Sequence, residues 1–142
     1  MDHYPFTHPS RSGIYRISPA SRAEVLAEAR RRMLSVCVAE LSGTRETGEV
    51  LRRIGQSADF PEWYGASFDG LADCLGDAEL SSGSGQAIVI TGHAGWRDAK
   101  ARDYAVLLKV LSGACVERRT SRSPLWVLIE NGPMDLPEFT GG

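Results

Sequence analysis

The chain has 142 residues and a formal net charge of -2, and 42% of its residues are hydrophobic. This length suits a single domain with one buried core, and the composition is too apolar for a disordered chain. The near-neutral charge argues against a protein-wide basic field of the kind that attracts nucleic acid or anionic lipid. We therefore expect one folded domain that binds neither nucleic acid nor a membrane directly.

Membrane-spanning, secretory and metal-binding signals are not evident in the sequence. No apolar stretch approaches the roughly 20 residues of a membrane span, and residues 1–13 lack the apolar core of a signal peptide. The three cysteines, Cys37, Cys74 and Cys115, lie far apart without a C-x-x-C pair, a pattern typical of reduced, mostly buried thiols. We expect a cytoplasmic protein with no metal site and no cofactor.

The first 41 residues predict an arm, a strand, a helix and a second strand. Residues 1–12 are rich in proline and small polar residues and are expected to form an extended or flexible arm. The alternating segment Ile14–Ile17 predicts a short edge strand, and an amphipathic helix follows it. Residues 34–41 are β-branched and apolar, so we expect a strand there, with Cys37 in the centre of the sheet.

The rest of the chain alternates helices with strands. A second helix is predicted from the apolar spacing of Val50, Leu51 and Ile54, and a third begins after Ser67. The later elements are a loop at 77–86, a strand at 87–91, a long helix through 104–115 and a strand at 125–130. The expected helix caps are Ser21, Thr44 and Ser67. Since helices separate the strands, we expect an α/β fold with a parallel sheet.

Negative charge is concentrated in one region. Residues 54–96 contain no lysine or arginine, and their acidic residues are Asp59, Glu62, Asp69, Asp73, Asp77 and Glu79. Asp69, Asp73 and Asp77 follow one another at intervals of four residues, on the opposite side of the third helix from its apolar positions Phe68, Leu71 and Leu75. Like charges at this spacing destabilise a helix by about 0.2–0.5 kcal/mol per pair. The column of carboxylates therefore indicates a role other than folding.

Several roles for this acidic column are open. A solvated helix face is the simplest. A divalent cation site is disfavoured because oxygens on one helix face converge poorly and the EF-hand pattern is missing. Acid–base catalysis is disfavoured because carboxyls in a row on an open helix share one environment. A basic partner fits better, since complementary charge speeds encounter and Trp63 and Tyr64, just upstream, offer aromatic anchors.

Residues 60–75, FPEWYGASFDGLADCL, closely resemble the signature of the barstar family of ribonuclease inhibitors. The wider pattern of strands and helices is similar to the longer, actinobacterial-type barstar-like proteins over about residues 13–130. The resemblance implies a parallel three-stranded sheet packed with helices, here extended by the N-terminal strand and helix. It also implies a barstar-like domain at 13–131, followed by a C-terminal tail at 132–142.

The resemblance further implies a non-enzymatic immunity protein that binds a basic, secreted, guanyl-specific ribonuclease as a 1:1 complex and is a monomer when free. By matching positions, Asp73 would occupy a phosphate site of the nuclease, Asp69 would make a second contact, and Trp63 would pack on the catalytic histidine. The expected partner-binding residues are Trp63, Gly65, Ser67, Phe68, Asp69, Ala72, Asp73 and Asp77. A barstar-like regulatory module for another basic partner is the alternative.

Four positions depart from the family pattern. Ser67 replaces the usual asparagine, and Ala72 and Ala78 stand where barstar itself has tryptophans. Gly113 falls near a contact glutamate of the last helix. A different cognate nuclease is the simplest reason for these changes.

Overall fold

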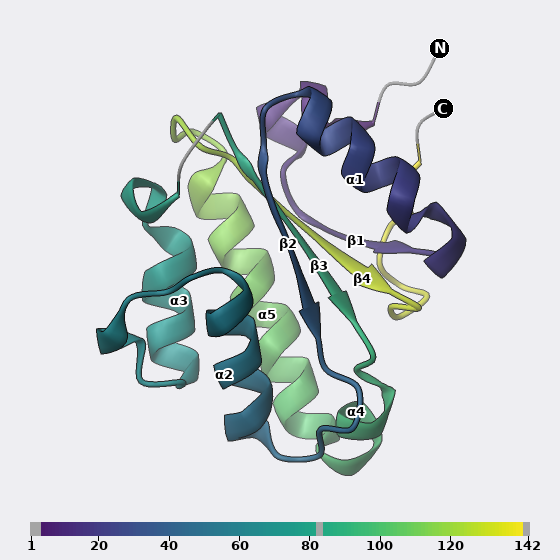
Figure 1. Ribbon diagram of the computed structural model, residues 1–142, viewed down its shortest axis with the longest axis vertical. Coiled ribbons are helices and arrows are strands. Elements are labelled where there is room, and N and C mark those ends of the chain that lie inside the picture. The colour runs from purple at the N-terminus through teal and green to yellow at the C-terminus, as the bar shows by residue number, and fades with distance from the viewer. Residues whose placement is uncertain (1–3, 82–83, 141–142) are drawn as a thin grey trace.

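The computed structural model describes residues 4–81 and 84–140, which fold around a four-stranded sheet (Figure 1). The strands are β1 (Ile14–Ile17), β2 (Ser35–Glu40), β3 (Gln86–Thr91) and β4 (Leu125–Glu130). They lie in the order β1-β4-β3-β2, and every pair is parallel. This confirms the predicted α/β fold and its extension by an N-terminal strand.

The position of β2 differs from the prediction. β1 pairs with β4 at the far side of the sheet, so β2 is left at the opposite edge with β3 as its one neighbour among the described residues. The expectation that Cys37 lies in a central strand is therefore wrong, and its side chain is half-buried. Apolar composition alone does not distinguish an edge strand covered by helices from a central one.

Helices cover both faces of the sheet (Figure 1). The main layer consists of α2 (Thr47–Ser57), α3 (Phe68–Gly76) and α5 (Ala101–Arg118), and α1 (Arg22–Arg31) covers the opposite face. A short helix, α4 (Ala94–Ala99), follows β3 in a segment to which the sequence analysis assigned no helix or strand. The 3-10 turns are Pro5–Thr7, Pro9–Arg11, Pro19–Ser21, Glu62–Tyr64 and Ala78–Leu80.

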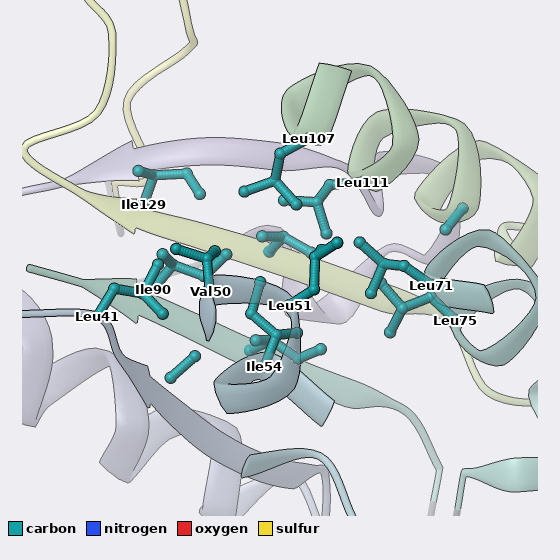
Figure 2. Close-up of a cluster of buried hydrophobic side chains, with 14 of the residues drawn as sticks. Leu41, Val50, Leu51, Ile54, Leu71, Leu75, Ile90, Leu107, Leu111 and Ile129 are labelled. Atoms are coloured by element: carbon teal, nitrogen blue, oxygen red, sulfur yellow. The ribbon is translucent and has the colours of Figure 1, made fainter. Parts of the chain in front are cut away.

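Two hydrophobic cores form on the two sides of the sheet. The larger one, shown in Figure 2, joins the helical layer to β3 and β4, and its members include Leu41, Val50, Leu51, Ile54, Leu71, Leu75, Ile90, Leu107, Leu111 and Ile129. The smaller one packs Val25, Leu26 and Ala29 of α1 against Val89 and Leu128. Both faces of the sheet are thus buried, as parallel sheets require.

The two ends of the chain contribute to the smaller core. The rings of Tyr4 and Phe139 stack at 5.3 Å, and Phe6 contacts Trp126 edge-on at 5.3 Å. All four side chains are buried. Residues 4–6 therefore pack on the domain, within the segment expected to be an extended or flexible arm, because their aromatic rings find an apolar surface; residues 8–11 are exposed. Residues 1–3 of that arm lie outside the described residues, and the boundaries at 12/13 and 131/132 remain predictions.

Of the three predicted caps, Ser21 and Ser67 stand at the N-cap positions of their helices, and of these two Ser67 forms the capping hydrogen bond. Ser67 caps α3 through its hydroxyl group. Ser21 has helical backbone angles, and its Oγ lies 2.9 Å from that of Ser18. Thr44 lies upstream of α2 and donates a 2.6 Å hydrogen bond to the Leu41 carbonyl, so it closes the turn after β2 instead. Hydroxyl residues serve turns as readily as caps, which explains both outcomes.

Candidate protein-binding surface

Helix α3 is fixed by its cap and by its apolar side. The Ser67 Oγ accepts a 2.9 Å hydrogen bond from the Gly70 amide, which satisfies one free N–H of the first turn. Leu71 and Leu75 are fully buried in the main core, and Phe68 is half-buried against it. The helix is therefore held in one orientation, with a defined side toward solvent.

That solvent side carries the acidic column. Asp69 and Asp73 are exposed on α3, and Asp77 is exposed directly after it. Ala72 is also exposed, so a short side chain lies among the carboxylates. Burial raises the pKa of the neighbouring Cys74 thiol, and the charges of Asp73 and Asp77 raise it further. The spacing-based expectation that the column faces away from the core agrees with these exposures.

The turn before α3 holds one aromatic residue and exposes the next. The Tyr64 hydroxyl donates a 2.7 Å hydrogen bond to the Leu51 carbonyl of α2, and its ring packs edge-on against Phe60. Gly65 then reverses the chain with φ near +70°, a left-handed conformation that favours glycine. Trp63 is 59% exposed beside this anchored turn. A rigid support thus presents a large aromatic side chain next to the acidic column.

Beneath the end of α3 lies a buried cation, Arg118. Its Nη1 donates to the Leu75 carbonyl at 3.1 Å and to Gln86 Oε1 at 2.7 Å. Its Nε and Nη2 donate to the carbonyl and hydroxyl of Ser123. Burial lowers the pKa of Arg118 to about 10, so it remains protonated at neutral pH. The guanidinium therefore ties α3 and α5 to the start of the sheet strands, a role that sequence reasoning missed.

A hollow of about 610 Å³ opens between α3 and α5. We call it the acidic hollow, and its lining residues are Trp63, Ala72, Asp73, Gly76, Asp77 and Glu117. Gly76 allows Glu117 to approach α3, since a Cβ at position 76 would lie 2.9 Å from Glu117 Oε1. The hollow thus brings together one exposed tryptophan and three carboxylates, which come from α3, from the residue directly after α3 and from α5.

The predicted binding residues divide into three groups. Trp63, Ala72, Asp73 and Asp77 line the acidic hollow. Gly65, Ser67 and Asp69 are exposed along the same segment without lining it, and Phe68 belongs mostly to the core. Glu117 was missed. Its signal in the sequence was an acidic residue one helical turn after Gly113, on the exposed side of the long helix.

The carboxylates of this surface are largely free of partners within the protein. Among the described residues, Asp69, Asp73 and Glu117 form no ion pair. Asp77 accepts a 2.9 Å hydrogen bond from the Glu79 amide, and Glu79 pairs with Arg122 at 3.3 Å. The negative potential at the hollow is therefore available to an outside cation.

Other candidate sites are structural in character. His93, in the loop after β3, is buried and stacks on Tyr104 at a ring separation of 5.3 Å. Trp96 and Trp126 are buried in the two cores. Within residues 4–81 and 84–140, no cluster of three or more His, Cys, Asp or Glu side chains has the arrangement of a metal site. No helix in the same residues is long and apolar enough to cross a membrane.

Comparison with known families gives one match. The model for "Barstar (barnase inhibitor)" matches residues 34–130, which is more than half of the chain. The matched segment runs from the start of β2 to the end of β4 and contains the whole acidic hollow. No curated protein matches the chain. Strand β1 and helix α1 lie outside the match. They form the N-terminal extension, in which β1 pairs with β4 at the sheet edge and α1 covers the face opposite the main helical layer.

Proposed function

The chain belongs to the barstar family, whose members inhibit ribonucleases and are not enzymes, and we propose that it blocks a basic, secreted, guanyl-specific ribonuclease inside the cell that makes it. The observation that carries this proposal is the acidic hollow. Exposed carboxylates that repel one another and form no ion pair among the described residues suit a surface whose cations come from another protein.

Within the hollow, Asp73 is the residue expected to act as a phosphate mimic. It lies in the second half of α3 and lines the hollow together with Ala72 of the same helix and Glu117 of α5. A ribonuclease active site gathers cationic groups where RNA phosphates bind, and a carboxylate held by a rigid helix satisfies them without being cleaved. Trp63 at the rim supplies an aromatic surface for a neighbouring ring of the enzyme.

The shape of the hollow constrains the partner. Ala72 and Gly76 give it short lining side chains where bulky ones would fill it. A protruding lysine or arginine of the nuclease therefore fits between Asp73, Asp77 and Glu117, because Ala72 has a short side chain where barstar itself has a tryptophan. This proposed contact accounts for the departure at Ala72 as an adaptation to a particular nuclease.

The proposed complex contains one nuclease per chain and involves no direct contact with nucleic acid or membrane. It forms in the cytoplasm, where a secreted nuclease is dangerous before export. A second candidate function uses the same surface: the acidic hollow would also suit a basic partner that is not a nuclease.

Inhibition titration tests the proposal. Purified chain is added in steps to a basic guanyl-specific ribonuclease, and cleavage of a fluorescent RNA substrate is followed. We expect activity to fall linearly to zero at one chain per enzyme, while an acidic ribonuclease of other specificity keeps its activity. If basic guanyl-specific enzymes stay active and a basic non-nuclease copurifies instead, the regulatory-module function holds.

A further inference from the structure

Arg118 is a buried cation that is held by neutral groups. The residue is 1% exposed, and its acceptors are carbonyl, amide and hydroxyl oxygens. Among the described residues it forms no ion pair. Burying a charge is costly even where it is hydrogen-bonded, and an apolar residue of similar volume often stabilises a core equally well. A buried guanidinium at this point therefore indicates a role beyond core packing.

The first segment that the guanidinium holds is the end of α3. Its Nη1 donates a 3.1 Å hydrogen bond to the Leu75 carbonyl. The last four carbonyls of a helix lack partners inside the helix, and many helices satisfy them through a left-handed residue after the last turn. Asp77 and Ala78, which follow α3, both have a negative φ. Arg118 therefore supplies a donor where this common closure is not used.

The second segment is the turn that follows α3. Ser123 Oγ accepts a 2.9 Å hydrogen bond from Arg118 Nη2 and donates one of 2.9 Å to Ser81 Oγ. Ser81 in turn ends the 3-10 turn, since its amide donates to the Ala78 carbonyl. The stretch that contains Asp77 thus runs between two points that one guanidinium network holds.

The same network fixes the opposite wall of the acidic hollow. Arg118 directly follows Glu117 in α5, which lies beside α3 (Figure 1), and Glu117 lines the hollow while Arg118 points into the protein. Its Nη1 donates to Gln86 Oε1 at 2.7 Å, and its Nε donates to the Ser123 carbonyl at 2.7 Å. These acceptors lie at the start of β3 and just before β4. One side chain therefore sets both walls of the hollow against the sheet.

We propose that Arg118 is a positioning residue for partner binding, which holds Asp73, Asp77 and Glu117 in the arrangement that the cations of the nuclease meet. This inference rests on the proposed function, because it takes the hollow as the binding surface. A guanidinium is required, since three separate nitrogens donate to four acceptor atoms and one ammonium group cannot cover that span. Charge-assisted hydrogen bonds are short and directional, so a small displacement of the carboxylates weakens them.

Arg118→Lys tests the proposal because it keeps the charge and loses the planar fork. In inhibition of a basic guanyl-specific ribonuclease, we expect dissociation to be faster by about tenfold or more. Association should stay within about twofold of wild type, because the surface charge is unchanged. Arg22→Ala is the matched control: it removes another hydrogen-bonded arginine, on the opposite face of the sheet, and should inhibit like wild type.

A double-mutant cycle separates positioning from a general loss of stability. In the Asp73→Ala background, the effect of Arg118→Lys on affinity should shrink to about threefold or less, because the main carboxylate that Arg118 positions is absent. A merely structural role would change the affinity by the same factor in both backgrounds, and that result would overturn the proposal.

Ser123→Ala is the second variant, in case Arg118→Lys does not fold. It removes the hydroxyl that joins Arg118 Nη2 to Ser81 and leaves the other three acceptors of the guanidinium in place. Dissociation should be faster by about threefold, and this effect should also depend on Asp73. Inhibition at the wild-type level by Ser123→Ala would overturn the proposal.

Hydrogen exchange of the free chain gives a readout that needs no nuclease. Arg118→Lys or Ser123→Ala should speed the exchange of amides at residues 73–81, while those of α1 keep their wild-type rates, as expected for local opening. Equal increases in both segments would show a global loss of stability and would overturn the proposal. A wild-type chain that leaves the nuclease active would refute the proposed function alone, and the exchange result would still decide whether Arg118 holds this segment.

Discussion

The two sides of the sheet carry their charges in opposite ways. On the α1 side, Glu28 is 5% exposed and is bound by both Arg31 and Arg32, and Glu130 is 4% exposed and is bound by Arg22. On the α3 side, Asp73 and the other carboxylates of the hollow are exposed and form no ion pair, among the residues described. Both sets consist of acidic residues, yet among the residues described only the set on the α1 side is paired with arginines.

This difference separates charges that serve folding from charges that serve binding. A buried carboxylate without a partner costs several kcal/mol, so those near α1 are retained only with their arginines. Exposed carboxylates in a column cost little individually, and they stay available to a partner. Each of the following predictions tests whether the two regions respond differently to the same kind of change.

The largest effect is expected on binding, from Asp73→Ala. If the nuclease surrounds this carboxylate with cations, its loss leaves them buried and unpaired, and the affinity should fall by about 2–5 kcal/mol or more. The matched control, Asp77→Ala at the end of the column, should cost about 0–1 kcal/mol, as a rim pair does. Calorimetry measures both. Equal, small losses would contradict the phosphate-mimic role.

The next effect is expected on stability, from Arg22→Ala on the other side. The Glu130 carboxylate would stay buried without its arginine. Among the described residues, the Thr91 hydroxyl, which donates a 3.0 Å hydrogen bond, would be its remaining side-chain partner. The free energy of unfolding should fall by about 3 kcal/mol, near the lower end for such losses because Arg22 is partly exposed. In Arg31→Ala, Arg32 still binds Glu28, so the loss should stay within about 1 kcal/mol. Urea unfolding measures both variants. Equal losses of stability for Arg22→Ala and Arg31→Ala would contradict the structural role assigned to the Arg22–Glu130 pair.

Salt should affect association more than folding. Exposed charges are screened over about 8 Å at physiological ionic strength, so raising the salt concentration should slow nuclease association by about tenfold or more. The unfolding midpoint should move less, because the carboxylates of Glu28 and Glu130 are buried, although their arginine partners reach solvent. Stopped-flow rates that are flat from low to high salt would rule out electrostatic steering by the hollow.

A smaller effect of pH on the free energy of unfolding is expected, through the buried side chain of His93. Burial lowers the pKa of His93, and the nearby Arg97 lowers it further, while Asp98 raises it. Both ring nitrogens are buried and have no hydrogen-bond partner among the described residues. The unfolded chain therefore takes up this proton first, so stability is complete above about pH 6.5 and falls as the pH drops below it. His93→Phe should flatten the slope between pH 7 and 5. The same slope in variant and wild type would contradict this assignment.

Much of the local structure could be predicted from sequence, because it depends on neighbouring residues. The β-branched run that forms β2, the Ser67 cap and the solvent side of α3 all follow from short-range patterns. The position of β2 in the sheet does not, since it is decided by where β1 pairs. Propensity and periodicity carry no information on strand order.

The candidate site was predicted in part for the same reason. The sequence predicts part of the acidic column, because the spacing and the family resemblance both depend on residues close in the chain; these residues are Asp69, Asp73 and Asp77. Glu117 joins them only because Gly76 lets α5 approach α3 closely. Arg118 looks like an ordinary cation at a helix end, and its burial depends on acceptors at Leu75, Gln86 and Ser123 that tertiary packing brings together.

The most direct test of the central claim is the stability of the free double variant Asp73→Asn/Glu117→Gln. These two exposed carboxylates line the hollow and form no ion pair in the described protein. If they are kept for a partner, the free energy of unfolding should hold or rise by a few tenths of a kcal/mol as repulsion is relieved, while nuclease inhibition is lost. A loss of stability as large as that of Arg22→Ala would show that the acidic surface serves the fold, and would contradict the account.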